Sequence, residues 1–336
     1  MKKVTILALE SAMSASVMGT MDIFSQAGFT YNYVMGADPK PFFDVTIASR
    51  DGKPIKCFNS AKIQPHCGIE NVDDTDLLII SSFTDFEILT SSRDLCTWVK
   101  EQYHKGVTIG SICLGSFFLA QTGLLDGKTA TTHWGFVQEF RKRYPKITLQ
   151  PEKLITDEGN LLCSGACNSY IDLSVYLIER FCGRNIALQC SKTMIHDFAR
   201  SSQVPYMVFQ PNRNHNDEQI LAIQNHIEEQ YYHRFNPEQL ARKYGMSRRT
   251  FERRFKKATG HTPVFFLQRS RVEAAKQMLE TGLQTFDEIA YKVGYEDSSF
   301  FRKVFVKHTG LRPSEYKAKF YKGYPVENAI FYEDAL

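Results

Sequence analysis

Residues 107–125 read VTIGSICLGSFFLAQTGLL, and this stretch decides the first half of the fold. Residues 107–112 are apolar or small and rich in β-branched side chains, which is typical of a buried strand. A helical pattern follows Cys113 directly. A tight turn from strand to helix holds one side chain at the end of a sheet, as in a nucleophile elbow. The sequence therefore predicts an α/β unit with Cys113 at such a turn.

Neighbouring segments extend this α/β pattern in both directions. Short apolar stretches at 4–9, 43–49 and 76–81 read as strands, and 94–104 reads as a helix. Residues 154–166 read as a hairpin that turns at 158–160, and 167–183 read as a helix ending at a glycine. The alternation predicts a doubly wound, largely parallel sheet. The first residues also allow a signal peptide, but their apolar run of six is short for one, which favours a buried strand.

Length and composition point to an ordinary globular protein of more than one domain. The chain has 336 residues, enough for two or three domains, with 43% hydrophobic and 23% charged residues. No apolar run is long enough to cross a bilayer, so no membrane partner is expected. The eight cysteines form no CxxC pair and no zinc-finger spacing, so we expect no metal, no cofactor and reduced thiols in a cytoplasm.

Charge is unevenly distributed along the chain. Residues 1–212 carry 20 basic and 21 acidic side chains, whereas residues 240–322 carry 19 basic and 8 acidic ones. A basic segment behind a neutral one indicates a nucleic-acid-binding domain, although charge alone fits a solvated surface equally well. Prolines, serines and asparagines at 201–216 indicate a linker. We therefore expect domains at 1–200 and 217–322, with a tail at 323–336.

The basic segment contains an internal repeat. LARKYGMS from Leu240 matches IAYKVGYE from Ile289, and FERRFKKATGHTP (251–263) matches FRKVFVKHTGLRP (301–313). Each copy has apolar anchors, a glycine for a left-handed turn, and a capping residue, Ser247 or Asp297, before a helix with two phenylalanines at i and i+4. This is the pattern of a helix-turn-helix, whose second helix enters the major groove.

Residues 220–320 resemble the AraC-type DNA-binding domain, in which a long helix, here 263–281, joins two helix-turn-helix units. The resemblance implies that the second helix of each unit reads bases. In the first unit the expected DNA-binding residues are Arg248, Arg249, Glu252, Arg253 and Lys256, and in the second they are Ser298, Ser299, Arg302 and Lys303. For any single arginine, base contact competes equally with a salt bridge or a phosphate contact. Arg254 and Lys257 are expected to contact phosphate or solvent.

Residues 110–136, GSICLGSFFLAQTGLLDGKTATTHWGF, resemble the PfpI-like, class I amidotransferase-like superfamily, and residues 156–179 continue the resemblance. Together with the AraC-type segment, the chain looks like the GlxA-like transcription regulators over nearly its whole length. The resemblance implies a flavodoxin-like, amidotransferase-like α/β fold, followed by an all-α domain with two helix-turn-helix units.

The elbow lacks the partners that a catalytic thiol needs. Hydrolytic relatives place a histidine directly after the cysteine, where this chain has Leu114, and a carboxylate where it has Met13. Related isocyanide hydratases use an aspartate at the position of Ser16. His133 remains a candidate polar wall. We therefore expect Cys113 to line a ligand pocket together with Leu114, Met13, Ser16 and His133. The alternative is a Cys113-dependent hydratase or amidase that carries a DNA-binding domain.

The combined pattern predicts a cytoplasmic transcription regulator that binds double-stranded promoter DNA. A non-catalytic first domain would sense a small nitrogenous metabolite, such as an amine or an amino-acid derivative, and would pair two chains into a homodimer. RNA polymerase is a further candidate partner. The identity of the effector, the operator and the direction of regulation do not follow from the sequence.

Overall fold

The computed structural model describes residues 1–197, 200–282 and 284–321, which form two compact units. The first unit is Met1–Gln203 and the second begins at Val204. Each unit has its own hydrophobic core. The tail expected at 323–336, with Lys322 before it, lies outside the described residues.

A seven-stranded sheet forms the centre of the first unit, in the order β10-β11-β7-β6-β1-β2-β5. All neighbouring strands are parallel except β10, which is antiparallel to β11. The strands are β1 (Lys2–Leu7), β2 (Phe43–Ser49), β5 (Cys67–Gly68), β6 (Leu77–Ile80), β7 (Thr108–Ile112), β10 (Ile155–Asp157) and β11 (Leu161–Ser164). The doubly wound, largely parallel sheet is confirmed, and the first residues form a strand in its interior.

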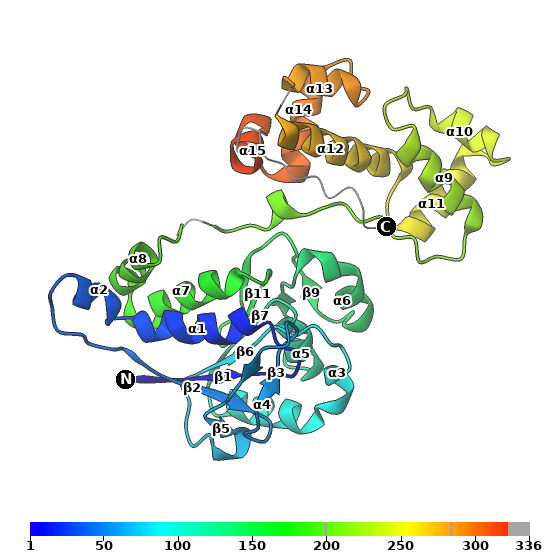
Figure 1. Ribbon diagram of the computed structural model, residues 1–336. Helices are drawn as coiled ribbons and strands as arrows, with labels where there is room; N and C mark the ends of the chain where they lie inside the picture. The colour runs from blue at the N-terminus through cyan, green and yellow to red at the C-terminus, as the bar shows by residue number, and fades with distance from the viewer. Residues whose placement is uncertain (198–199, 283, 322–336) are drawn as a thin grey trace. The chain divides into compact units, whose positions relative to one another are not determined.

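Helices cover both faces of this sheet (Figure 1). On one side lie α1 (Ser14–Gln26), α7 (Ser169–Cys182) and α8 (Arg184–Thr193), and on the other lie α3 (Ile88–Ser91), α4 (Arg93–His104) and α5 (Gly115–Gln121). Short elements complete the unit: α2 (Thr30–Val34), α6 (Val137–Arg143), the pair β3 (Ile55–Lys56) and β4 (Lys62–Ile63), and the pair β8 (Thr129–Ala130) and β9 (Thr148–Leu149).

The strand order fixes where a site can form. From β1 the chain first adds β2 and β5 on one side and later adds β6, β7 and β11 on the other. In such sheets, ligands bind at the carboxyl ends of the strands, near the point where the direction of strand addition changes. Here that point lies between β1 and β6, so the residues that follow β1, β6, β7 and β11 gather at one edge.

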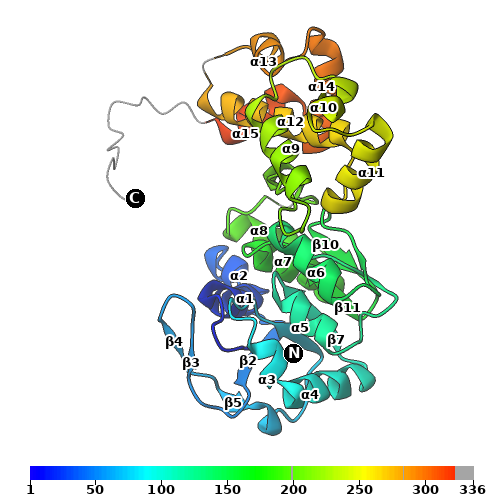
Figure 2. The same cartoon turned by 90° about the vertical axis from the view of Figure 1, so that its right-hand side faces the viewer.

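The described part of the second unit contains helices and no strand (Figure 2). They are α9 (Glu218–Glu229), α10 (Pro237–Lys243), α11 (Arg248–Thr259), α12 (Pro263–Thr281), α13 (Phe286–Lys292), α14 (Ser298–Thr309) and α15 (Pro313–Phe320). Two small cores form around the phenylalanine pairs of α11 and α14, and α12 contributes to both. The joining helix predicted at 263–281 is confirmed with those bounds.

Both turns of the repeat have the predicted local geometry. Gly245 and Gly294 have φ values of 68° and 89°, the left-handed region that favours glycine. The Ser247 hydroxyl accepts from the N–H of Thr250 at the start of α11, and the Asp297 carboxylate accepts from two N–H groups at the start of α14. The caps satisfy otherwise free donors, so each recognition helix begins at a fixed residue.

Residues 201–212 are held by contacts within the units. The Gln203 side-chain amide donates to the carbonyl oxygens of Pro151 and Lys153 in the first unit. Residues 204–212, here called the strap, begin the second unit and contact its helix α12. The Lys276 ammonium donates to the Met207 carbonyl at 2.8 Å, and the Phe209 N–H donates to a Glu273 carboxylate oxygen at 3.1 Å.

Candidate DNA interface and ligand pocket

The first recognition helix, α11, separates a buried face from a cationic one. Phe251 and Phe255 are fully buried in the core of their unit. The opposite face exposes five cations: Arg248, Arg249, Arg253, Lys256 and Lys257. An α-helix fits into the major groove of DNA, where arginine can pair with guanine. The helix therefore brings the residues predicted for the first unit to one surface.

The cations of α11 differ in their partners. Arg248 Nε donates to Glu252 Oε1 at 2.8 Å, and this hydrogen bond raises the pKa of Arg248. The two residues thus partly neutralise each other. Arg249, Arg253 and Lys256 form no ion pair with any described residue. These three side chains, and Lys257, which also forms no ion pair with a described residue, are available to phosphates or base edges.

Arg254 serves the fold of the second unit, in contrast to its expected role toward phosphate or solvent. Its guanidinium donates to both carboxylate oxygens of Asp217, at 2.7 and 3.1 Å, and to Gln219 Oε1 at 2.8 Å. Asp217 also caps α9, and the hydrogen bond from Arg254 lowers the pKa of that carboxyl. The pair therefore ties α11 to α9.

The second recognition helix, α14, is less basic. It exposes Ser299, Arg302 and Lys303, while Ser298 at its first turn is half-buried. The Arg302 guanidinium lies 5.3 Å from the centre of the Phe286 ring, and its Nη2 lies 3.6 Å from a carboxylate oxygen of Asp287.

Sequence reasoning missed two apolar residues on this surface. Phe300 is 50% exposed and Val306 is 36% exposed. Apolar side chains on a groove-facing helix can contact the thymine methyl group. In the repeat, Phe300 and Val306 stand where the first unit has Thr250 and Lys256, which is the signal that could have identified them.

The elbow has the predicted layout of strand, turn and helix. Cys113 follows β7 and precedes α5, with a φ of 54°, which is uncommon for a residue other than glycine. Its N–H donates to the Ser164 carbonyl at 2.9 Å. A Cβ at Gly115 would lie 2.8 Å from the carbonyl oxygens of Ile80 and Ser81, so only glycine fits there. Cys113 itself is 2% exposed and Leu114 is buried beside it.

Two of the predicted pocket residues reach this turn through Ser82. The Met13 N–H donates to the Ser82 carbonyl at 3.0 Å, and the Ser82 N–H donates to the Ser16 hydroxyl at 3.1 Å. The Ser82 hydroxyl is buried, has no hydrogen-bond partner within the described ranges, and acts to lower the pKa of Cys113. The loops after β1, β6 and β7 thus meet, but none of the three residues here is a carboxylate or an imidazole.

His133 directly follows Thr132, which contacts the elbow, but the His133 side chain itself makes its contacts with neighbouring residues. The neighbouring Thr132 hydroxyl donates to the Cys113 carbonyl at 3.3 Å. The His133 Nδ1 accepts from the Gly135 N–H, and its ring stacks on Trp134 at 5.2 Å between centres. Burial lowers the pKa of His133. Within the described residues it makes no hydrogen bond to the Cys113 thiol.

A second cysteine, absent from the sequence-based prediction, touches Cys113. The Sγ atoms of Cys113 and Cys167 are 3.6 Å apart. The hydrogen bond with Cys167, together with burial, raises the pKa of Cys113 well above its ordinary value, so this thiol stays protonated near neutral pH. The same contact lowers the pKa of Cys167 to about 7. The feature that could have identified Cys167 from the sequence is its position shortly after β11, the strand that pairs with β7.

A cavity of about 330 Å³ opens at the same edge of the sheet, at the carboxyl ends of β1, β2 and β6. Its lining carries four carboxylates: Glu10, Asp51, Asp85 and Glu87. One cation, Arg50, also lines it. Arg50 is paired with Asp94 at 2.8 Å and Asp51 with Lys53 at 2.6 Å, which leaves Glu10, Asp85 and Glu87 as the lining carboxylates without an ion pair to a described residue. Local sequence patterns do not indicate this cavity, because its lining comes from loops far apart in the chain. The balance of charge suits a small cation.

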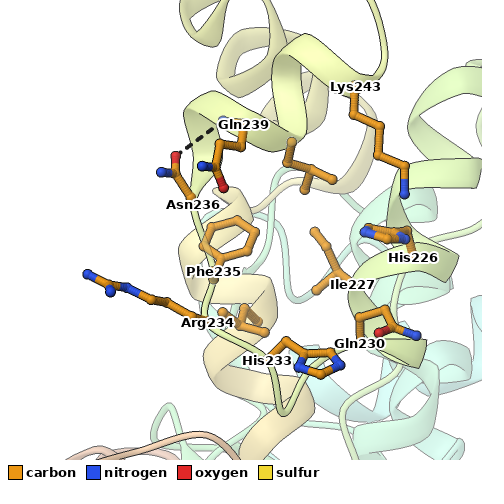
Figure 3. Close-up of a pocket in the computed structure, with 11 residues that line it drawn as sticks. His226, Ile227, Gln230, His233, Arg234, Phe235, Asn236, Gln239 and Lys243 are labelled. Atoms are coloured by element: carbon orange, nitrogen blue, oxygen red, sulfur yellow. Dashed lines mark hydrogen bonds between the residues drawn. The ribbon is translucent and has the colours of Figure 1, made fainter.

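The second unit has a cavity of about 230 Å³ against α9, α10 and the loop between them (Figure 3). Ile227 and Phe235 form apolar parts of its lining, while Lys243 and His226 lie on one side. Burial and the nearby Lys243 lower the pKa of His226. With His233 and Arg234 also present, this lining can accept an anionic group.

Among residues 1–197, 200–282 and 284–321, no three histidine, cysteine or acidic side chains are grouped as a metal site would require. None of the described helices combines the length and hydrophobicity of a bilayer-spanning segment.

Two capped helix-turn-helix units with cationic faces, joined to a doubly wound α/β unit, define a DNA-binding protein with an added α/β domain. The DJ-1/PfpI family model matches residues 2–180, and a helix-turn-helix domain model matches residues 240–319. The chain belongs to the DJ-1/PfpI family, and its second unit carries a helix-turn-helix domain of the AraC type.

Similar proteins share this architecture. The HTH-type transcriptional regulator CdhR of Pseudomonas aeruginosa is 26% identical over 274 residues, which cover 81% of each chain. The HTH-type transcriptional regulator GlxA of Rhizobium meliloti is 24% identical over 215 residues, covering 64% of this chain and 66% of the relative. The crystal structure of Drosophila melanogaster DJ-1beta has a TM-score of 0.50 and 18% identity, covering 58% of this chain and 98% of its own, and supports the fold alone. The predicted combination of domains in a transcription regulator is confirmed.

Proposed function

We propose that the chain regulates transcription by binding promoter DNA sequence-specifically through α11 and α14, under the control of a small nitrogenous effector. The observation that carries the DNA-binding part is the repeated, capped helix with cations on its exposed face. Arg249, Arg253, Lys256 and Lys303 form no ion pair with a described residue, so each can neutralise a phosphate or reach a base.

Fluorescence anisotropy with labelled duplexes tests this proposal on the full chain. We expect tight binding to DNA from upstream of the protein's own gene and weak binding to a scrambled duplex. Phosphate contacts by Arg253, Lys256, Lys257 and Lys303 predict that log Kobs falls with log salt at a slope of about −4. Equal affinity for both duplexes at moderate salt would remove sequence-specific regulation.

We propose that the first unit does not catalyse a reaction. The Cys113 thiol is buried, its pKa is raised, and Leu114, Met13 and Ser16 stand where a base or a carboxylate would act. A nucleophilic thiol needs a lowered pKa or an adjacent base. Neither condition is met at the elbow.

The acidic cavity supports a positively charged nitrogen compound as the effector. Its carboxylates can pair with an ammonium group, and its position at the carboxyl ends of β1, β2 and β6 is typical of ligand sites in parallel sheets. A thermal-shift screen of the full chain should find stabilisation by amines or amino-acid derivatives and not by neutral isosteres. Glu10→Gln should reduce the shift, whereas Asp22→Asn, an exposed change outside the cavity, should not. Equal shifts in both variants would dismiss this cavity as the site.

We also propose that two chains pair through the first unit. Phe29, Tyr33, Val34 and Met35 expose large apolar side chains in and beside α2, and such patches often mark protein interfaces. Light scattering should give a dimer mass for the wild type and a larger monomer fraction for Val34→Asp.

A regulator of this kind would act where promoter DNA lies, in the cytoplasm, with RNA polymerase as a second partner.

A further inference from the structure

The carboxyl ends of two neighbouring strands bring Cys113 and Cys167 together. Strand β7 pairs with β11 in parallel register, Ile112 opposite Ser164, and each cysteine follows one of these strands. The Cys113 N–H also donates to the Ser164 carbonyl. The backbone around the elbow is therefore fixed by the sheet, and the two Sγ atoms lie 3.6 Å apart. A disulfide requires about 2.0 Å, a change that small side-chain movements can supply.

The two thiols differ in accessibility and in acidity. Cys113 is 2% exposed, whereas Cys167 is half-buried and precedes the 14-residue helix α7. Contact with Cys113 lowers the pKa of Cys167 to about 7, so a substantial fraction of it is thiolate at neutral pH. Thiolate is the reactive form toward oxidants. Cys167 therefore is the residue that meets an oxidant first, and Cys113 is the thiol next to it.

We propose that Cys113 and Cys167 form a reversible redox pair, in which a hydroperoxide oxidises Cys167 and Cys113 then closes a disulfide. The six other cysteines are also free thiols. Among the residues that the structure describes, they form no sulfur–sulfur hydrogen bond of this kind. The pair is a modification site separate from DNA contact and from the acidic cavity, so it adds a second input to the proposed regulator.

The chemistry proceeds in two balanced steps. The Cys167 thiolate attacks one oxygen of hydrogen peroxide, so that an S–O bond forms, the O–O bond breaks, and the hydroxide released takes up a proton to become water. The Cys113 sulfur then attacks the resulting sulfenic sulfur. An S–S bond forms, the S–O bond breaks, and the hydroxide takes the Cys113 proton to leave as a second water. The two sulfurs lose two electrons, which reduce the peroxide.

Mass spectrometry of the full chain tests the pair directly. Hydrogen peroxide in small excess should lower the intact mass by two hydrogen atoms. Digestion without reductant should yield one linked species containing the Cys113 and Cys167 peptides, and dithiothreitol should restore both thiols. Peroxide treatment that adds oxygen atoms to Cys167 without any linked peptide would overturn the proposal, as would linkage between other cysteines. This measurement needs no variant and does not depend on DNA or effector binding.

Variants assign the two roles. Cys167→Ser should slow peroxide oxidation of Cys113 by about tenfold or more, because the remaining thiol is buried and protonated. Cys113→Ser should leave Cys167 as a sulfenic acid that dimedone traps. Cys182 is a half-buried free cysteine at the other end of α7. Cys182→Ser is therefore the matched control, and this variant should still form the Cys113–Cys167 disulfide. Unchanged oxidation of Cys113 in Cys167→Ser would reject the assigned order.

Discussion

Cys113 adopts a left-handed backbone conformation, with φ at 54°, which costs about 1–3 kcal/mol for a residue other than glycine. In an enzyme this strain would present a nucleophile to substrate. Here the side chain is buried, Leu114 is buried next to it, and the only polar side chains identified close to its sulfur within the described residues are the Ser82 hydroxyl and the Cys167 thiol. The geometry of an elbow is therefore present without the acid–base partners of a hydrolase.

Cys113→Ser should leave DNA binding intact. The residue belongs to the first unit and not to either recognition helix, so we expect affinity for the promoter duplex within about twofold of wild type under reducing conditions. Assays with amide and isocyanide substrates should give no thiol-dependent turnover. Turnover of about 1 per second that vanishes in Cys113→Ser would instead establish an enzyme.

Two cations at opposite ends of α11, Arg249 and Lys257, should separate base reading from phosphate contact. Arg249→Ala should relax sequence preference at one half-site and cost about 1–3 kcal/mol on the preferred duplex. Lys257→Ala should weaken binding to all duplexes alike and reduce the salt slope by about 1. Anisotropy titrations against single-base variants of the duplex measure both effects. If both variants behave alike, the two roles are wrongly assigned.

At the scale of elements, the two recognition helices are built alike but carry different surfaces. Helix α11 exposes five cations, whereas α14 exposes three, Arg302, Lys303 and Lys307, together with Phe300 and Val306. Phosphate neutralisation depends on the number of cations, while apolar groups distinguish thymine by its methyl group. We therefore expect α11 to supply most of the electrostatic affinity and α14 to favour thymine-containing steps.

Arg254→Ala should destabilise the second unit, because it leaves Asp217 without its partner on α11. The pair is partly exposed, at 34% and 25% for the two side chains, so the loss should be about 1 kcal/mol in the free energy of unfolding. Urea denaturation of residues 204–321, followed by circular dichroism, measures it. Arg253→Ala is the matched control and should leave stability within about 0.5 kcal/mol while weakening DNA binding. Equal stability of both variants would contradict this role.

His308 should make the second unit sensitive to acid. Burial, aided by Arg269 and Lys307, lowers the pKa of His308 to about 4, and its buried Nε2 has no hydrogen-bond partner among the described residues. Below about pH 6.5 this histidine binds a proton in the unfolded chain but stays neutral in the folded unit. Stability should therefore fall as pH decreases from about 6.5 toward 4, by about 1–3 kcal/mol from this group.

His308→Ala should flatten that part of the pH profile, and alanine is the residue that the first repeat has at the same place, Ala258. The comparison is between slopes of unfolding free energy against pH, because the substitution also removes packing. Parallel slopes for wild type and variant would show that other groups cause the acid sensitivity.

At the scale of the molecule, local sequence patterns predicted the elements that depend on local rules. Strand 43–49, helix 263–281 and the caps at Ser247 and Asp297 follow from periodicity and capping chemistry, and the structure has them at those positions. Strand β1 is Lys2–Leu7, two residues earlier than the predicted 4–9, and its first two residues are exposed lysines. Polar strand ends carry no hydrophobic signal.

Local sequence patterns could not predict contacts between distant parts of the chain. The Arg254–Asp217 pair joins residues 37 apart, and the two sulfurs of the redox pair are 54 apart. The acidic cavity takes its lining from the loops after three strands. No local spacing brings such groups together, so only the topology of the sheet and the packing of helices could identify them.

The strap should contribute to the stability of the second unit. The Phe209 ring packs on Phe266 at 5.3 Å between centres, and the Arg269 guanidinium lies 5.2 Å from its centre. Phe209→Ala should therefore cost about 2 kcal/mol in the free energy of unfolding of residues 204–321. Val208→Ala, at a half-exposed neighbour, should change it by less than about 0.5 kcal/mol. A similar small effect for both would show that the strap is only a covalent connection.

The strap also bears on how this architecture could be recombined. Its partners Phe266, Arg269, Glu273 and Lys276 all lie on α12, so a helix-turn-helix module that began at residue 217 would lose the apolar contact with Phe266 and the hydrogen bond to the half-buried Glu273 carboxylate. Gln203, one residue before the strap, is held by the α/β unit. A gene fusion that exchanges sensor domains should therefore join the two parts between residues 203 and 204, so that the transferred DNA-binding module includes the strap that packs on α12.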